Sequence, residues 1–317
     1  MKFNGLPWDM QDKISRCLET FNRKIPILLL GETGVGKSYL ARIIHENSVW
    51  RKGEFIRIDI SSLENELFEA ELFGYEKGAF TGALKGGKKG LLDRAQGGTV
   101  FFDEIGNLDL RYQKKLLIFL DDRRYRRVGG NRFIQLEAGL IFATNIDLLR
   151  AVKNGIFRQD LYFRINSCVI EIPPLRERSN YLLEIIDDLI KHKGLKKVKF
   201  TENALKKLKE YTWPGNVREL LNYIIHWNIS GLETVDVENL PDNIRNLYSV
   251  YNLKESVNRY RLEHVRRVMK ISGGDTKMAA KLLGISRQHL YRLLKQMEEP
   301  LLDDLEPPYE KTNDKEG

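Results

Sequence analysis

The stretch IPILLLGETGVGKSYLARII, residues 25–44, determines the fold more than any other part of this sequence. Its centre fits the pattern G-x-x-x-x-G-K-[ST] of phosphate-binding loops. The apolar run before this centre predicts a buried strand, and the run after it predicts a helix whose N-terminus favours anions. A glycine turn that binds nothing is the alternative, which this order of strand, loop and helix disfavours. We therefore expect a nucleotide-binding loop made of Gly31, Glu32, Thr33, Gly34, Val35, Gly36, Lys37 and Ser38.

Each residue type in this loop has a physical task. The glycines let backbone N–H groups close around phosphate oxygens, Lys37 adds a mobile cation, and Ser38 can ligate Mg²⁺. ATP and Mg²⁺ are accordingly the expected cofactors.

A second motif, GGTVFFDE at residues 97–104, ends an apolar run with two carboxylates. Ligands of open α/β sheets collect at the carboxyl ends of the strands. We assign Asp103 to Mg²⁺, together with Ser38, and Glu104 to orienting and deprotonating the attacking water. An Asp-Glu pair after a strand often has no function beyond ending the strand. Here Asp103 lies 65 residues after Ser38 of the phosphate-binding loop, and this spacing favours a catalytic role.

Two more segments carry polar groups. LIFATN, residues 140–145, is a third strand ending in Thr144 and Asn145. GAFTGA, residues 78–83, contains glycines and alanines that allow a loop to project from the surface. Phe80 and Thr81 would expose an aromatic ring and a hydroxyl group at the tip of that loop. Taken alone, these two segments indicate only an asparagine turn and a flexible surface loop.

From about Ile27 to Leu220 the chain resembles the central ATPase domain of bacterial enhancer-binding proteins, the AAA+ activators of sigma-54 RNA polymerase. The motifs that carry the resemblance are the phosphate-binding loop, ELFGYEKGAFTGA at residues 71–83, LIFATN, FRQDLYFR at residues 157–164 and WPGNVREL at residues 213–220. The resemblance implies an α/β AAA+ P-loop NTPase sheet domain with a helical lid.

The resemblance also implies roles for individual residues. Thr144 and Asn145 would form sensor I, which reads the γ-phosphate, and Arg218 would be sensor II, near the phosphates. Arg158 and Arg164 would serve a neighbouring subunit's nucleotide as arginine fingers, a task suited to a fixed fork of donors. Local pairing of either arginine with a carboxylate such as Asp160 is the alternative. The sigma-54 contact would be made by Gly78, Ala79, Phe80, Thr81, Gly82 and Ala83.

Two positions depart from the family pattern. Many relatives have Asn where this chain has Asp59, and that Asn is thought to restrain the catalytic Glu. We expect Asp59 to face Glu104, and two nearby carboxylates repel unless one is protonated or a cation bridges them. We therefore hypothesise altered coupling between the loop and hydrolysis. Relatives also often place an arginine where this chain has Gly139, which puts subunit communication by that route in doubt.

Positive charge is densest near the C-terminus, where residues 256–296 hold 10 Lys and Arg against 2 Asp and Glu. Helices are expected at 260–269, 277–283 and 287–296, with a turn at Gly284 and Ser286 as N-cap. This pattern is a small all-α helix-turn-helix, and it resembles the Fis-type DNA-binding domain. Leu290, Leu293 and Leu294 are expected in its core, although a solvated basic helix without a DNA role is the alternative. The expected DNA contacts are Arg287, Gln288, His289, Tyr291, Arg292 and Lys295.

The expected organisation is an α/β subdomain at 1–170, a helical lid at 171–235, a linker at 236–255, the helix-turn-helix at 256–296 and an acidic, disordered tail at 297–317. Cys17 and Cys168 show no metal spacing and are expected to be reduced, buried thiols. The apolar runs are too short to span a membrane, so a cytoplasmic location is expected. Only about 24 residues precede the first strand, too few for a receiver or sensor domain of about 100 residues. Control is then expected from a partner protein in trans, from expression level, or from a sensor removed from this chain.

Together with the C-terminal helix-turn-helix, the resemblance implies an ATPase that binds upstream DNA as a dimer, assembles into a hexameric ring and remodels the closed promoter complex of sigma-54 RNA polymerase. A DNA-binding AAA+ repressor and a replication-initiator-like ATPase are the alternatives. Neither needs the GAFTGA segment.

Overall fold

The computed structural model of the chain describes residues 8–63, 67–80, 84, 86–245 and 253–298. It comprises two compact units, Met1–Asn239 and Leu240–Gly317. Thr81, Gly82 and Ala83 of the expected sigma-54 contact lie outside the described residues, as does all but the start of the tail that we expected to be disordered. Within the described ranges, no helix has the length and apolar character needed to cross a membrane.

Five parallel strands form the central sheet of the first unit, in the order β2-β5-β8-β1-β9. The phosphate-binding loop follows β1, which lies between β8 and β9. Because parallel strands end at the same edge, this order brings the loop close to the carboxyl ends of β5 and β8. The strands are β1 (Ile27–Leu30), β2 (Phe55–Asp59), β5 (Thr99–Asp103), β8 (Gly139–Thr144) and β9 (Cys168–Glu171).

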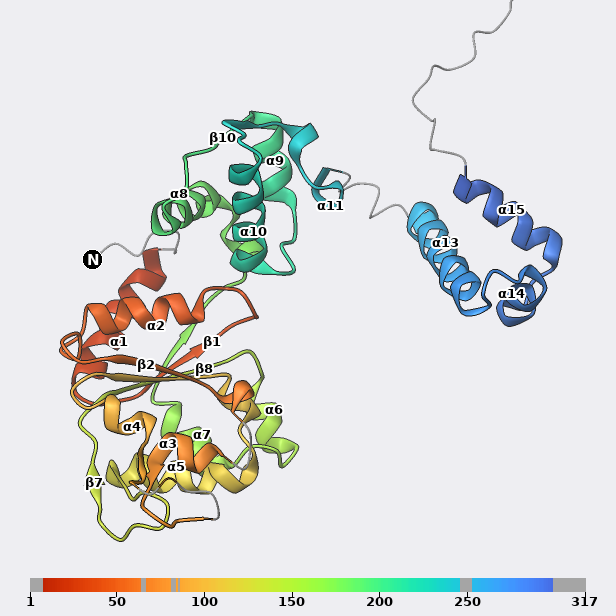
Figure 1. Ribbon diagram of the computed structural model, residues 1–317. Helices are drawn as coiled ribbons and strands as arrows, with labels where there is room; N and C mark the ends of the chain where they lie inside the picture. The colour runs from red at the N-terminus through yellow and green to blue at the C-terminus, as the bar shows by residue number, and fades with distance from the viewer. Residues whose placement is uncertain (1–7, 64–66, 81–83, 85, 246–252, 299–317) are drawn as a thin grey trace, which may run out of the picture. The chain divides into compact units, whose positions relative to one another are not determined.

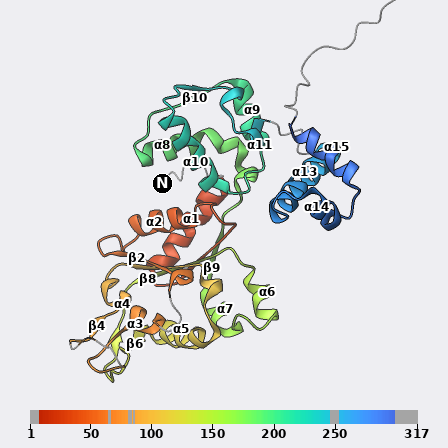
Figure 2. The ribbon, with the colours of Figure 1, turned by 45° about the vertical axis from the view of Figure 1, so that its right-hand side comes forward.

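Helices cover both faces of the sheet (Figures 1 and 2). Leu28 packs into the cluster on one face, and Ile27 and Leu29 pack into the cluster on the other. All three side chains are buried, which explains the continuous apolar run of β1. One face carries α1 (Trp8–Asn22) and α2 (Lys37–Glu46); the other carries α3 (Phe68–Phe73), α4 (Leu91–Arg94), α5 (Leu110–Asp122), α6 (Leu148–Lys153) and α7 (Gln159–Ile165).

Short elements connect this framework. Two 3₁₀ turns follow strands of the sheet: η1 (Ile60–Ser62) comes directly after β2, and η2 (Ile105–Asn107) comes one residue after β5. Two small antiparallel pairs, β3 (Gly74–Tyr75) with β4 (Lys88–Lys89) and β6 (Arg124–Tyr125) with β7 (Ile134–Gln135), lie beside the second helical face.

A helical lid follows β9. Trp213 and Trp227 are buried in it, and the indole N–H of Trp213 donates to the carbonyl of Leu208 at 2.8 Å. Its elements are η3 (Leu175–Tyr181), α8 (Leu182–Lys193), β10 (Lys199–Phe200), α9 (Glu202–Glu210), α10 (Asn216–Ile229), β11 (Thr234–Val235) and η4 (Val237–Asn239).

The second unit contains α11 (Asp242–Arg245) and three longer helices, α13 (Leu253–Ile271), α14 (Thr276–Leu283) and α15 (Arg287–Glu298). Leu290 and Leu293 are buried with Val265 and Ala279, and Leu294 packs against them, as predicted. Residues 236–255, which we expected to be a linker, include η4, α11 and the start of α13.

The expectation that both cysteines are reduced thiols was wrong, because the structure joins Cys17 and Cys168 in a disulfide. Helix α1 packs against the edge strand β9 and brings the two Cα atoms to 6.1 Å, within the range a disulfide spans. The two cysteines are 151 residues apart in the chain, so the sequence offered no spacing that indicated the pair.

The packing at Gly139 explains why this position carries no arginine. A Cβ atom added there would stand 2.3 Å from Cζ of Phe21 and 2.7 Å from Cδ1 of Trp50. Any side chain would therefore collide with the end of α1 and with the indole ring.

Candidate nucleotide site

The phosphate-binding loop passes directly into α2, which begins at Lys37. The side chain of Lys37 is only 6% exposed, and its Nζ donates to the backbone carbonyl oxygens of Gly31 (2.9 Å) and Glu32 (3.3 Å). Burial lowers the pKa of Lys37, while the nearby carboxylates of Glu104 and Asp103 oppose that shift. The ammonium group is thus held inside the loop, with carbonyl oxygens that phosphate oxygens can replace.

Both carboxylates of the second motif lie beside this lysine. Asp103, at the end of β5, is buried, and its Oδ2 accepts a hydrogen bond from Oγ of Ser38 at 3.0 Å. Glu104 has a left-handed backbone (φ 55°), and its Oε1 is 3.9 Å from Nζ of Lys37. The other oxygen, Oε2, is buried and has no hydrogen-bond partner within the described residues.

These oxygens fit the expected magnesium ion. Ser38 and Asp103 offer a hydroxyl and a carboxylate, the hard oxygen donors that Mg²⁺ takes alongside phosphates and water. The orphaned Oε2 of Glu104 needs a hydrogen-bond partner, which a water can supply.

An additional cation reaches the same carboxylate from β2. In the register of the sheet Asp59 lies opposite Asp103 rather than Glu104, the residue we expected it to face. Arg57 forms an ion pair with Asp103 (Nη2 to Oδ2, 2.8 Å) and a second with Asp59 (Nη2 to Oδ2, 3.5 Å). Arg57 therefore bridges Asp59 and Asp103. From the sequence we allowed for a bridging cation but did not identify this arginine.

The end of β8 contacts the phosphate-binding loop. The amide of Asn145 donates to the hydroxyl of Thr33 at 2.9 Å. Thr144 is buried, and its hydroxyl accepts from the backbone N–H of Ile146 at 3.1 Å. The structure thus brings Asn145 into contact with the loop and places Thr144 opposite Leu30, the last strand residue before the loop.

The lid is attached to the loop through Asn216, a fully buried residue with a left-handed backbone (φ 52°). Its amide donates to Oε2 of Glu32 and to the carbonyl of Thr33, both at 3.1 Å, and its Oδ1 accepts from the N–H of Leu175 at 2.8 Å. Arg176 pairs with Glu32 as well; hydrogen bonds from Arg176 and then Asn216 lower the pKa of Glu32 to about 2.

Arg218 approaches the loop from the same lid helix. Its backbone N–H donates to the carbonyl of Gly34 at 3.3 Å, and its side chain is exposed. Gly34 has φ +82°, and a Cβ atom there would stand 2.4 Å from the carbonyl oxygen of Gly215. Only glycine therefore allows the lid to come this close.

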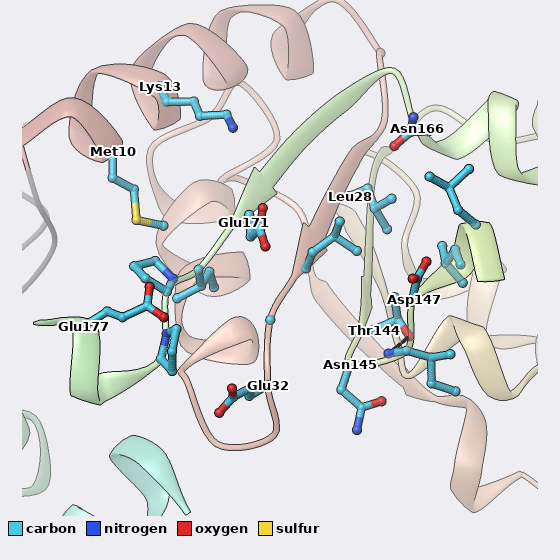
Figure 3. A pocket seen from close by; sticks show the side chains of 18 of the residues that line it. Met10, Lys13, Leu28, Glu32, Thr144, Asn145, Asp147, Asn166, Glu171 and Glu177 are labelled. Carbon is cyan, nitrogen blue, oxygen red and sulfur yellow. Dashed lines mark hydrogen bonds between the residues drawn. The ribbon is translucent and has the colours of Figure 1, made fainter. Parts of the chain in front are cut away.

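A cavity of about 770 Å³ opens next to the loop, and Figure 3 shows its walls. Thr144 and Asn145 line it from the end of β8, Glu171 from the end of β9, and Lys13 from α1. Glu32 of the loop also lines it, whereas the cluster of Lys37, Ser38, Asp103 and Glu104 does not. Its volume is in the range of small-molecule sites, roughly 300–1,000 Å³.

The two expected arginine fingers lie elsewhere. Arg158 pairs with Asp160 at 2.7 Å, as the alternative interpretation had it, and Arg164 pairs with Asp121 at 3.2 Å. Among the residues that the structure describes, neither arginine forms a hydrogen bond or an ion pair with the phosphate-binding loop. A buried glutamine that sequence analysis missed positions this segment: Oε1 of Gln113 accepts from the N–H of Arg158 at 2.7 Å.

The described half of the GAFTGA segment lies on the small strand pairs. The ring of Phe80 is 40% exposed and contacts Tyr75 edge to face, with centroids 4.9 Å apart. Glu76 N–H donates to the carbonyl of Val128 at 3.0 Å, so the hairpin of β6 and β7 supports the base of the segment.

The expected DNA-contacting residues lie on α15, where the side chains of Arg287, Gln288, His289, Tyr291 and Arg292 are exposed. The side chain of Lys295 is outside the described set. Ser286 caps the helix as predicted, because its Oγ accepts from the N–H of His289 at 3.2 Å.

Comparison with known proteins gives two family matches. Residues 5–171 match the Sigma-54 interaction domain, and residues 176–255 match the AAA+ ATPase lid domain. A solved structure, NtrX from Brucella abortus in complex with ATP, is similar with a TM-score of 0.65 and 27% identity, covering 92% of this chain and 67% of that one.

Curated relatives include a protein named limonene hydroxylase from Geobacillus stearothermophilus, 39% identical over 284 residues. Another is the alginate biosynthesis transcriptional regulatory protein AlgB of Pseudomonas aeruginosa, 41% identical over 278 residues. Each alignment covers 85% of this chain but only 51% and 62% of the respective relative. Because the sigma-54 match alone covers more than half of the sequence, this chain belongs to the family of AAA+ ATPase-type proteins that carry the sigma-54 interaction domain.

Proposed function

We propose that this chain uses ATP hydrolysis, in the cytoplasm, to activate transcription by sigma-54 RNA polymerase. The observation that carries the proposal is the cluster at the sheet edge, where Lys37, Ser38, Asp103 and the unpartnered oxygen of Glu104 meet at the phosphate-binding loop. Family membership supplies the partner, because the domain that contains this cluster is the sigma-54 interaction domain.

Each side chain then has a task in hydrolysis. Lys37 exchanges its two carbonyl partners for phosphate oxygens, and Ser38 with Asp103 would hold Mg²⁺, which neutralises phosphate charge. Glu104 orients the attacking water and takes its proton at Oε2. Thr144 and Asn145 sense the γ-phosphate, and Arg218 approaches the phosphates from the lid.

Replacing Glu104 by Gln tests this assignment. ATP binding should persist, because Lys37 and Ser38 are unchanged, while hydrolysis falls at least about a hundredfold with the loss of the base. Glu54, an exposed carboxylate paired with Arg94, provides the matched Glu54→Gln control, which should hydrolyse ATP at the wild-type rate. Undiminished turnover by Glu104→Gln would remove the proposed site.

Subunits would assemble into a hexameric ring in which Arg158 and Arg164 serve a neighbour's nucleotide. Both are partly exposed and held by the carboxylates Asp160 and Asp121, which an incoming phosphate group can replace. Mixing two inactive variants, Lys37→Ala and Arg158→Ala, tests this idea. Activity should return in the mixture, because some interfaces then combine an intact loop with an intact arginine. No recovery at any ratio would show that Arg158 acts within its own subunit or not at all.

The GAFTGA segment, Gly78 to Ala83, would contact the sigma factor. Its base is supported by β6 and β7, and the exposed ring of Phe80 offers an apolar contact. Thr81→Ala should abolish capture of sigma-54 in ADP and aluminium fluoride while ATP turnover persists. Thr212→Ala, another exposed threonine, is the control. Capture that survives Thr81→Ala would argue against this contact.

The second unit would bind upstream DNA as a dimer, with a regulatory protein acting in trans on the ATPase. Arg287, Gln288, His289, Tyr291 and Arg292 line the exposed side of α15, and Lys295 would contact the DNA backbone from the same helix. Arg287→Ala should weaken DNA binding, and Arg292→Ala should also flatten its salt dependence through the loss of a phosphate contact. Lys209→Ala on α9 is the control, and equal binding by all of these proteins would exclude α15 as the DNA-contacting helix.

A further inference from the structure

The strand β2 presents an arginine to the metal-binding end of the site. Residues two apart on a strand point to the same face, so Arg57 and Asp59 share a face with Asp103, which lies opposite Asp59 in the register. The guanidinium group reaches both carboxylates, at 2.8 Å to Asp103 and 3.5 Å to Asp59. The side chain of Arg57 is half exposed, whereas that of Asp103 is 6% exposed.

Two cations compete for one oxygen in this arrangement. The atom that Arg57 approaches is Oδ2 of Asp103, which also accepts the hydroxyl proton of Ser38 at 3.0 Å. A magnesium ion bound between Ser38 and Asp103 needs that region of the carboxylate at about 2.0–2.1 Å. A guanidinium group and a divalent cation repel each other, so both cannot contact Oδ2 in this way.

We propose that Arg57 is a built-in counter-ion that neutralises Asp103 when the site lacks metal, and that binding of a divalent metal with nucleotide transfers its guanidinium group to Asp59. The inference rests on the proposed nucleotide site and goes beyond it by naming a residue that sets the metal affinity. Asp59 is the receiving group, because its carboxylate is already within 3.5 Å of the same Nη2 atom. A neutral asparagine at this position would give the displaced cation no charge partner.

The transfer would also alter the start of the segment that leads to the sigma-54 contact. Oδ1 of Asp59 caps η1 by accepting from the N–H of Ser61 at 3.1 Å. The hydroxyl of Ser61 accepts from the amide of Asn107 in η2, just after Glu104, at 3.0 Å. When the guanidinium group of Arg57 moves to Asp59, it therefore acts on the turn η1, which is hydrogen-bonded to η2 just after Glu104.

Metal binding in the presence of ADP tests the proposal without relying on activity. Mn²⁺ is the probe, and the free ion is measured by electron paramagnetic resonance during titration. Arg57→Gln should bind Mn²⁺ about tenfold more tightly than wild type, because a charge-assisted pair with a buried carboxylate no longer competes. Asp59→Asn should bind Mn²⁺ more weakly than wild type, because the arginine then has only Asp103 as a charge partner.

Arg94→Gln is the matched control, since Arg94 is an exposed arginine paired with Glu54 at the opposite end of β2 and β5. Its Mn²⁺ affinity should equal that of wild type. Unchanged or weaker binding by Arg57→Gln, or an equal gain in the control, would overturn the role of Arg57 while leaving the nucleotide site intact. If wild type binds no Mn²⁺ with ADP, the proposed nucleotide function fails, and this inference with it.

Discussion

Replacing Asn216 by Ala should both destabilise the first unit and weaken nucleotide binding. The substitution removes the acceptor for the N–H of Leu175, a fully buried residue, and an orphaned buried donor costs about 1–3 kcal/mol. It also puts alanine at φ 52°, where a left-handed backbone costs about 1–2 kcal/mol for an ordinary L-residue. Together these terms predict a loss of about 2–5 kcal/mol in the free energy of unfolding. At about 2–4 °C per kcal/mol for domains of 150–250 residues, Tm should fall by roughly 4–20 °C.

Two further variants separate the causes. Asn216→Gly loses the same hydrogen bonds but accepts the left-handed backbone, so it should be about 1 kcal/mol more stable than Asn216→Ala. Asn216→Asp keeps the acceptor for Leu175 but turns a carboxylate oxygen toward Glu32. Its loss in the free energy of ATP binding should therefore exceed its loss in the free energy of unfolding. Thermal unfolding by circular dichroism and fluorescence titration with a labelled ATP measure the two effects. The reasoning would be refuted if the Tm of Asn216→Ala lay within 1 °C of wild type. It would also be refuted if Asn216→Gly unfolded at a lower temperature than Asn216→Ala.

Burial lowers the pKa of His45 below its usual 6.5. As pH falls below 6.5, the unfolded chain therefore binds a proton before the folded chain does, and the folded state loses stability. Between pH 7.5 and 5.5, the Tm of His45→Gln should accordingly fall by less than the Tm of wild type. Gln113→Leu leaves the N–H of Arg158 and two carbonyl oxygens without their partner, so the free energy of unfolding in urea should fall by about 2–4 kcal/mol, and an unchanged midpoint would contradict the positioning role of Gln113. Gly34→Ala places a methyl group 2.4 Å from a carbonyl oxygen of the lid, and it should lower ATP affinity more than tenfold. Gly36→Ala also has a positive φ, +109°, but the added methyl group meets open space. Its ATP affinity, measured by the same fluorescence titration, should therefore fall less.

The parts of the site that the sequence predicted are those encoded within one continuous segment. The strand, loop and helix order around Lys37 follows from local hydrophobic periodicity, and the position of Asp103 follows from an apolar run that ends in acid. The buried leucines of α15 follow from the same kind of pattern, because Leu290 and Leu293 lie three residues apart on one helical face.

The parts that could not be predicted depend on which segments the fold brings together. The ion pair of Arg57 with Asp103 requires the register between β2 and β5, which no local pattern specifies. Gln113 looks like an ordinary helical residue until α5 is packed against the segment before α7. The disulfide of Cys17 with Cys168 likewise requires the packing of α1 on β9.

Thr33 is held from two directions, and this has a mechanical consequence. Its hydroxyl is tied to Asn145 at the end of a sheet strand, and its carbonyl is tied to Asn216 in the lid. A movement of the loop that shifts the whole of Thr33 would change both hydrogen bonds at the same time. The contacts of the loop with the sheet and with the lid are thus coupled at a single residue.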